Sequence, residues 1–218
     1  MKKHLICLAA LATLGLGSSV QAQDIYGGLG MPGLYTLGYA HPMGGSWGLR
    51  GEYASGLSWT GSGTDNGVSY SASIKSSRAG LFADWFPFGG GFRFVGGITA
   101  NDQKMDINAL GTGTATINNK PVNMSGHYFN MNLKYPTATP YLGIGYGHQM
   151  TTKGLGFYAD LGVTFGSFAA DLSTDLGGSG NVGGVTQADV DAQKQQMNES
   201  LGGLKYLPSF SAGMVYRY

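Results

Sequence analysis

The sequence predicts an all-β protein, more specifically an antiparallel transmembrane β-barrel. After residue 22, segments of about ten residues carry apolar side chains at alternate positions, as barrel strands do. Glycine (39 residues), tyrosine (13) and phenylalanine (10) are abundant, while only 11% of the residues are charged. No later stretch offers the roughly 20 consecutive apolar residues of a spanning helix. A closed sheet is the other way to pair every backbone group in lipid.

Residues 1–22 read as a secretory signal peptide. Lys2 and Lys3 precede an apolar run, and Ala22 ends a small-residue cleavage site, so residues 23–218 form the mature barrel domain. Cys7 is the single cysteine and leaves with the signal, which excludes disulfides. Removing two lysines from 13 basic residues leaves 11 against 12 acidic ones, so no basic excess points to nucleic acid. Export together with this composition predicts the outer membrane of a Gram-negative cell.

Nine segments qualify as candidate strands: 33–41, 46–59, 68–86, 91–105, 124–135, 140–150, 154–166, 168–176 and 204–218. In the second segment, one face carries Trp47, Leu49, Tyr53, Leu57 and Trp59. Bacterial single-chain barrels have an even number of strands, so one assignment must be wrong. The weakest are the first, which follows Pro32 and Gly33, and the pair around Pro136 and Pro140, which reads equally as one bent strand. We expect eight strands, with ten as the alternative.

Short connections are expected at 41–46, 87–91, 136–140 and 166–168, and longer ones at 60–67, 103–123 and 176–203. Residues 150–154 are a short exception. Barrels place short turns on the periplasmic side and long loops outside, which puts Tyr218 at the periplasmic end. Within the long loops, 114–123 predicts a small hairpin. The stretch from Thr186 to Gly203 predicts a short helix, with Thr186 and Asp189 as a capping box.

Aromatic residues near strand ends favour a membrane barrel over a soluble sandwich, whose strands also alternate. We expect interface girdles formed by Trp47, Trp59, Trp85, Phe88, Tyr216 and Tyr218. A last strand that ends in an aromatic residue also resembles the signal read by the outer-membrane assembly machinery.

Charged residues of the candidate strands fall on the face opposite the apolar one. The expected lumen-facing charges are Arg50, Glu52, Arg78, Asp84, Arg93, Lys134, Asp160 and Arg217. Five basic against three acidic residues predict a slightly basic lumen, which reads either as a selective polar path or as paired charges filling a narrow barrel. Inward glycines were expected to leave room for water beside them, namely Gly143, Gly145, Gly147, Gly156 and Gly162.

Cofactor and catalytic signatures are weak. The "GIGYG" stretch at 143–147 lies within a strand and precedes no helix, which excludes a dinucleotide fingerprint. His41, His127 and His148 lie in three different segments, so no metal is expected. A serine hydrolase at the rim is a weaker rival without a distinctive motif. We therefore expect neither a cofactor nor an enzymatic activity.

Four blocks carry a family resemblance: "DWFPFGGGFRFVGGITAND" (84–102), "PYLGIGYG" (140–147), "ADLGVTFGS" (159–167) and "YLPSFSAGMVYRY" (206–218). In this order and spacing they resemble the small monomeric outer-membrane barrels related to the carbapenem-resistance-associated outer-membrane protein, also described as ornithine-uptake porins, and more loosely the OmpW type. The resemblance implies an eight-stranded barrel that admits small solutes such as basic amino acids. It implies no solute-binding motif.

These observations predict a narrow porin-like channel for small hydrophilic solutes such as amino acids. The alternatives are a closed structural or surface-binding barrel and, least favoured, a lipid-modifying enzyme. The expected partners are outer-membrane lipids and lipopolysaccharide, the assembly machinery and small solutes, and we expect a monomer.

Overall fold

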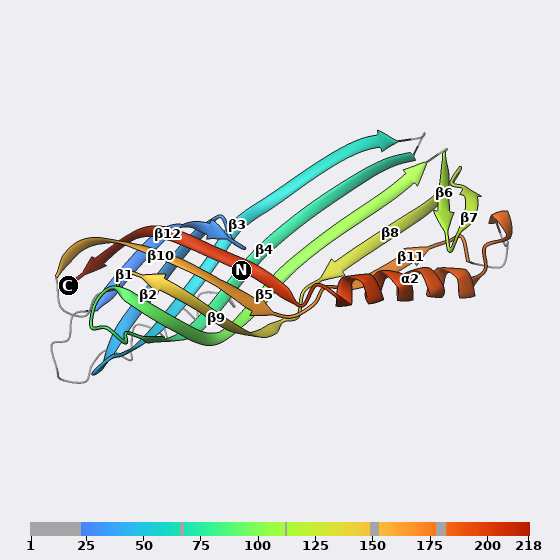
Figure 1. Cartoon of the computed structure of the whole chain (residues 1–218). Coiled ribbons are helices and arrows are strands. Elements are labelled where there is room, and N and C mark those ends of the chain that lie inside the picture. Colours follow the sequence, from blue (N-terminus) through green and yellow to red (C-terminus); the bar gives the residue numbers. More distant parts are fainter. Residues whose placement is uncertain (1–22, 66–67, 112, 149–152, 178–181) are drawn as a thin grey trace, which may run out of the picture.

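The computed structural model describes residues 23–218 except 66–67, 112, 149–152 and 178–181. The predicted signal peptide, residues 1–22, lies outside the described residues. The described chain builds a ten-stranded sheet, a two-stranded hairpin and an α-helix (Figure 1). The sheet contains β1 (Asp24–Met31), β2 (Tyr35–Gly44), β3 (Trp47–Asp65), β4 (Val68–Trp85), β5 (Phe92–Gly111), β8 (His127–Lys134), β9 (Ala138–Tyr146), β10 (Gly154–Phe165), β11 (Ala169–Thr174) and β12 (Tyr206–Arg217).

The sheet closes on itself, which confirms the predicted antiparallel barrel. Among the described residues the closed ring runs β1, β2, β3, β4, β5, β9, β10 and β12, and it closes where β12 pairs with β1. Every pairing in it is antiparallel, with Asp24 opposite Arg217 and Phe92 opposite Tyr146. No helix within the described ranges is long and apolar enough to cross a membrane.

Two pairs of strands run end to end. β5 pairs with β9 over Phe92–Ala100 and with β8 over Lys104–Leu110, and backbone bonds from Tyr135 N to Gln103 O and from Asn101 N to Thr137 O bridge the joint. The bent-strand interpretation around Pro136 and Pro140 is therefore correct. β11 likewise continues beyond β10 and pairs with β8. The short turns predicted at 136–140 and 166–168 are wrong, because both segments are joints along a strand.

The strand β1 was missed. Its sequence, DIYGGLGM, contains three glycines, which leave too few side chains to show alternation. In the structure the alternation is present, since Asp24 and Tyr26 are buried whereas Ile25 and Leu29 are exposed. Adding β1 and merging the two end-to-end pairs reconciles the nine candidates with the ring.

One end of the barrel carries Tyr218 and the short connections; we call it the C-terminal end. β2, β4 and β9 end there, and β3, β5 and β10 begin there. Gly44 and Gly45 form the first of these turns with φ values of 92° and 62°, which glycine adopts without strain. The short connection predicted at 150–154 lies mostly outside the described residues, which include only Lys153 and Gly154 of it.

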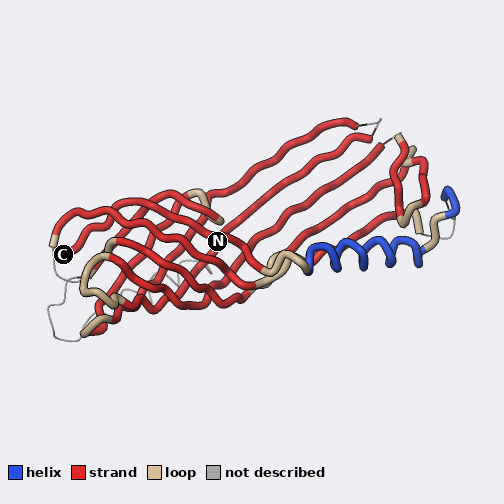
Figure 2. The backbone as a smooth tube through the Cα atoms, viewed as in Figure 1, coloured by secondary structure: helices blue, strands red, loops and turns tan. Residues whose placement is uncertain are grey.

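Beyond the other end of the ring, the distal parts of β3, β4 and β5 continue beside β8 and β11 as an open sheet (Figure 2). We call this sheet, with its hairpin and helix, the extension. β3 reaches Asp65 and β5 reaches Gly111, so much of the loops predicted at 60–67 and 103–123 is strand.

The hairpin and helix predicted from the sequence are both present. β6 (Thr114–Ile117) and β7 (Lys120–Asn123) turn at Asn118 and Asn119, whose φ values are 46° and 63°. The helix α2 (Gln187–Gly202) begins with the expected capping box and follows a 3-10 turn, η1 (Val182–Gly184). α2 covers the free edge of β11, because the Asn198 side chain accepts a hydrogen bond from Ala170 N at 2.7 Å and donates to Ala170 O at 3.0 Å.

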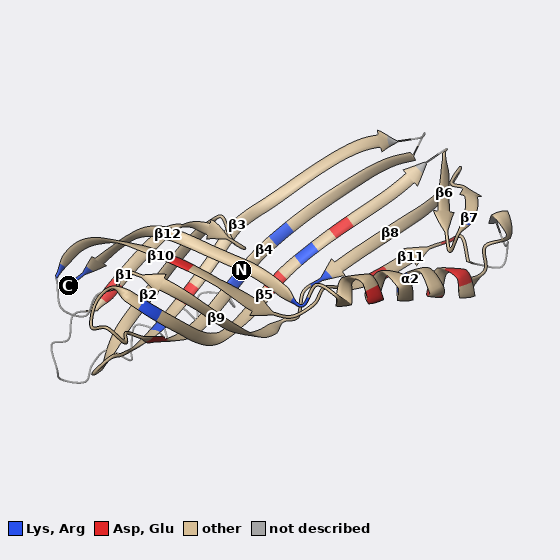
Figure 3. Cartoon of the chain, viewed as in Figure 1, with Lys and Arg blue, Asp and Glu red and all other residues tan. Residues whose placement is uncertain are grey.

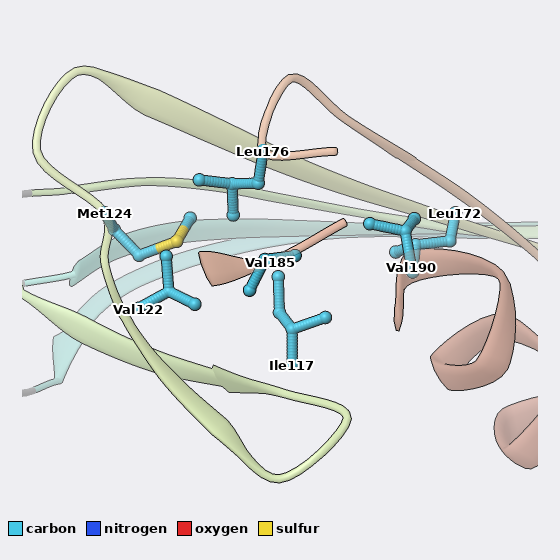
Figure 4. Close-up of a cluster of buried hydrophobic side chains, with 7 residues drawn as sticks. All are labelled: Ile117, Val122, Met124, Leu172, Leu176, Val185 and Val190. Atoms are coloured by element: carbon cyan, nitrogen blue, oxygen red, sulfur yellow. The ribbon is translucent and has the colours of Figure 1, made fainter. Parts of the chain in front are cut away.

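A buried apolar cluster holds the tip of the extension together (Figure 4). It joins the hairpin, β11, η1 and α2 through Ile117, Val122, Met124, Leu172, Leu176, Val185 and Val190. Asp189 supports this junction: it accepts from Lys120 Nζ at 2.7 Å, from Asn118 Nδ2 at 2.9 Å and from Thr186 N at 2.9 Å. The carboxylate thus caps the helix and holds the hairpin against it.

We expect Asp189→Ala to release the hairpin from α2. Faster hydrogen exchange at 114–123 and in the first turn of α2 is the expected readout. Asp191→Ala is the control, because the Asp191 carboxylate accepts from Gln187 on the exposed face, and it should leave exchange unchanged.

Hydrogen bonding from Lys120, Thr186 and Asn118 lowers the pKa of Asp189 well below its usual range. The contact is therefore complete above about pH 4 and is lost only below it, so equal protection at pH 7 and pH 5 is expected. Loss of protection by pH 5 would contradict this assignment.

Candidate functional site

The barrel has an inverted surface: its large apolar side chains point outward and its charges point inward. On β12, Phe210, Met214 and Tyr216 are exposed, while Ser209, Ser211 and Arg217 are buried. The same alternation holds on β4 and β9. A soluble sheet would expose the polar face. The interior of the ring is therefore the candidate site.

Arg50 is the hub of the interior. Its Nε donates to Asp84 Oδ2 at 3.0 Å, and its Nη1 lies 3.1 Å from Glu52 Oε2 and 3.3 Å from Asp160 Oδ2. The guanidinium also lies over the Phe82 ring, 4.8 Å from its centroid. Arg50 is 1% exposed, so three carboxylates from three strands compensate one deeply buried cation.

Two further arginines complete this network. Arg93 Nη2 donates to Asp160 Oδ1 at 2.5 Å and its Nη1 donates to Gly147 O at 2.9 Å. Arg78 Nη2 donates to Glu52 Oε1 and its Nη1 donates to Ser209 Oγ, both at 2.8 Å. The three arginines and three carboxylates together form what we call the lumen network. Figure 3 colours the charged residues along the strands.

A second cluster lies toward the C-terminal end. Arg217 Nε donates to Asp24 Oδ1 at 2.6 Å, and His148 Nδ1 lies 3.0 Å from Asp24 Oδ2. The His148 ring packs against Tyr26 with a centroid distance of 4.6 Å. Sequence reasoning missed Asp24 because it missed β1, although a buried arginine at Arg217 already required a carboxylate partner.

The interior charges balance, so the predicted basic lumen is wrong. The structure buries seven of the eight expected charges and leaves Lys134 exposed at the end of β8, beyond the closed ring. Asp24 takes its place among the buried groups. Within the described residues, four arginines face four carboxylates: Arg50, Arg78, Arg93 and Arg217 against Asp24, Glu52, Asp84 and Asp160.

Aromatic rings fill the space around the network. Tyr26, Phe82, Tyr141 and Tyr158 are all buried, and glycines on neighbouring strands accommodate them. A Cβ atom on Gly38 would overlap the Tyr26 ring, and one on Gly162 would overlap the Tyr141 hydroxyl.

The expected water space beside the inward glycines is therefore wrong at four of the five positions. The Tyr141 hydroxyl lies against Gly143 and Gly162, and the Asp160 and Arg93 side chains lie against Gly145. Gly147, which follows β9 with a φ of 97°, lies against Phe157 O and Tyr158, and Gly156 alone has only Val215 nearby.

Five of the six expected girdle aromatics lie at the C-terminal end. Trp47 and Trp85 stack across β3 and β4 with centroids 6.2 Å apart, and Trp85 stacks on Phe94 at 5.7 Å. Phe88, Tyr216 and Tyr218 are exposed at the same end.

Trp59 is the exception, because it lies in the distal part of β3, and a β-bulge also changes the face on which it lies. The register between β3 and β4 shifts between Ala54 and Leu57, and Gly56 within the bulge has a φ of 96°. Trp47 therefore pairs with outward-facing Trp85. Trp59 pairs with Ile74, which lies on the same inward face of β4 as Ser76 and Arg78. The expected placement of Trp59 and Leu57 on the Trp47 face is wrong.

The polarity of the sheet reverses in the extension. Its inner face carries Ile74, Met105 and Leu133, in register with one another across β4, β5 and β8, and Ile107, which is opposite Met131. Its outer face carries mainly serine, threonine, asparagine and lysine. The outer face of the extension is therefore polar, whereas the outer face of the ring is apolar.

The histidines His127 and His148 lie in separate parts of the structure. His127 and His148 contact Asp175 and Asp24, respectively. Among the described residues, no three histidine, cysteine or acidic side chains gather as metal ligands.

Comparison with solved structures identifies the architecture. The structure is similar to crystal structures of CarO and CarO2 from Acinetobacter baumannii. The CarO match has a TM-score of 0.57 and 19% identity over 91% of this chain and 98% of that one; the CarO2 match has 0.60 and 20% over 93% and 100%. This chain has the fold of the CarO barrels. The resemblance indicated by the sequence is thereby confirmed in the fold. No protein-family model and no curated protein sequence matches the chain.

Removing one member of the lumen network should destabilise the CarO-like ring strongly. Arg93→Ala removes one of the two arginines that compensate the buried Asp160 carboxylate. We therefore expect the free energy of unfolding to fall by about 3–5 kcal/mol, as measured by urea titration in lipid vesicles. Arg93→Met combined with Asp160→Leu should recover part of this loss, because it removes both charges. Lys134→Ala, which is exposed, should change stability by less than about 0.5 kcal/mol. Equal effects of Arg93→Ala and Lys134→Ala would contradict a buried network.

Proposed function

We propose that the protein is an integral outer-membrane barrel whose lumen is closed and whose extension stands outside the cell as a surface-exposed element. The observation that carries the proposal is the inverted ring, with apolar side chains outside and a neutral, paired set of charges inside. Outward apolar surface of this extent is stable in lipid and not in water.

The dimensions of the ring support a span. On β5 the outer face is apolar or small from Phe92, which pairs with outward-facing Tyr146, to Ala100, and its first charged residue is Asp102. The ten residues from Phe92 to Asp102 cover about 33 Å along the strand. A tilt of about 35–45° reduces this to about 23–27 Å, which matches the apolar band of about 25 Å in outer-membrane barrels.

The closed lumen distinguishes this proposal from the porin-like channel for amino acids that the sequence favours. A channel would require the Arg50 contacts to Glu52, Asp84 and Asp160 to separate and the surrounding rings to move. Separating buried ion pairs leaves uncompensated charges, which is costly. The proposal includes lipid and lipopolysaccharide as neighbours, insertion by the assembly machinery through β12, and no catalytic step.

A matched pair of substitutions on β5 tests the membrane placement. Ile98 is 64% exposed and Leu110 is 63% exposed, but Ile98 lies on the ring and Leu110 on the extension. Ile98→Lys should cost about 2–4 kcal/mol of stability in vesicles, because it places a charge near the bilayer midplane. Leu110→Lys should have little effect. Equal costs for the two variants would contradict the proposed span.

Solute flux tests the closed lumen. Reconstituted wild-type protein should neither raise bilayer conductance nor admit amino acids into vesicles, while a known porin in parallel does both. Protease protection of the ring confirms that the protein has inserted. Specific conductance or amino acid uptake by inserted protein would overturn the closed lumen and support the channel.

A further inference from the structure

Three lysines form a row across neighbouring strands. Lys75 on β4 pairs in register with Lys104 on β5, which pairs in register with Lys134 on β8 (Figure 3). All three are exposed. Because directly opposed residues share one face of a sheet, the three ammonium groups project from the same side.

The lysine row faces outward at the level where the apolar surface ends. Lys75 lies on the same face of β4 as outward-facing Leu81 and Trp85. Lys104 lies on the same face of β5 as outward-facing Phe94 and Ile98. Lys75 lies ten residues from Trp85, and the same spacing separates Lys104 from Phe94. If the Trp85–Phe94 stack marks one membrane interface, the lysine row lies at the other, about 25 Å away.

Among the described residues, one close ion pair serves the three lysines of the row. Like charges directly opposite each other are destabilising. Asp102 pairs with Lys104 at 2.7 Å, and Asp106, which accepts from the Asn132 amide, also attracts Lys104. Asp171 pairs with Lys194 at 2.6 Å and attracts Lys134 without a direct ion pair. Within the described chain, Lys75 and Lys134 make no ion pair with a carboxylate. An external anion between them would relieve the repulsion.

Farther along the same strands, the outer face offers hydrogen-bonding groups. Ser71, Asn108 and Asn130 are in register across β4, β5 and β8. With Tyr128 and neighbouring residues they line an open pocket of about 480 Å³. Hydroxyl, amide and aromatic groups together suit a sugar. Asn108 lies four residues beyond Lys104, about 13 Å along the strand.

We propose that the lysine row binds the phosphate groups of lipopolysaccharide in the outer leaflet, with the sugar moiety in the adjoining pocket. The inference rests on the outer-membrane placement proposed above. With strands about 4.8 Å apart, the row spans about 10 Å, so its flexible side chains reach more than one phosphate. Lysine binds phosphate as a point charge, and the apolar outer face below the row packs against the acyl chains.

Binding of purified lipopolysaccharide to folded barrels in zwitterionic nanodiscs tests the site. The apparent Kd is measured by native mass spectrometry for the wild type, for Lys75→Gln/Lys104→Gln/Lys134→Gln and for the matching triple arginine variant. Neutralisation should weaken binding about fivefold per lysine, on the order of a hundredfold in total. The arginine variant should stay close to the wild type, as should Lys153→Gln at the C-terminal end.

Three further arms separate the possible ligands. Dephosphorylated lipopolysaccharide should bind the wild type weakly, and inorganic phosphate in large excess should not displace the intact lipid. Asn108→Leu with Asn130→Leu should weaken binding about fivefold for each lost hydrogen bond. Unchanged binding in the triple glutamine variant would overturn the proposal. Displacement by inorganic phosphate would overturn the lipid assignment, and unchanged binding in the asparagine variant would overturn the glycolipid assignment.

Insertion is scored separately by protease protection of the ring. A barrel that does not insert contradicts the proposed membrane placement. An inserted barrel whose lipopolysaccharide affinity is unaffected by the lysine substitutions contradicts the lysine site alone.

Discussion

The Arg50 guanidinium and the three carboxylates around it set the architecture of the ring. A barrel of this width has an interior just large enough for its own side chains, so any charge placed there must find its counter-charge there. Arg50 draws on Glu52 from its own strand, Asp84 from β4 and Asp160 from β10, which lie on opposite parts of the ring. The ion pairs among these residues connect strands that are distant in the ring. Nearby glycines, which have no side chain, leave the room that the network and its aromatic neighbours occupy.

The same strands serve two environments. In the ring, β4 and β5 expose Leu81 and Ile98 and bury charge; beyond Lys75 and Lys104 they expose polar groups and turn Ile74 and Met105 inward. The alternation of the backbone does not change, only the chemistry assigned to each face. The reversal marks the level at which an apolar surrounding gives way to water, and the apolar cluster under the hairpin and α2 gives the extension a small core of its own.

Much of this was predictable, and the failures have physical causes. Alternation places Arg50, Asp84, Arg93 and Asp160 on one face because the strand period is two, and the capping residues Thr186 and Asp189 mark α2 directly. Three features escape the pattern. Glycines conceal β1 and hence Asp24, the bulge at Gly56 moves Trp59 to the other face, and Lys134 keeps the correct alternation but lies beyond the ring. Partner identity also required the register, since Arg93 and Asp160 are far apart in sequence.

Solvent exchange of the arginine Nε protons tests the central claim most directly. In the folded barrel in micelles, the nitrogen-15 NMR signals of Arg50 and Arg217, whose Nε groups donate to Asp84 and Asp24, should persist with exchange far slower than in a free arginine side chain. Selective loss of each signal in Arg50→Lys and Arg217→Lys assigns it. Exchange at the rate of free arginine would contradict the account, because it would show that water reaches the charges that are held to close the lumen.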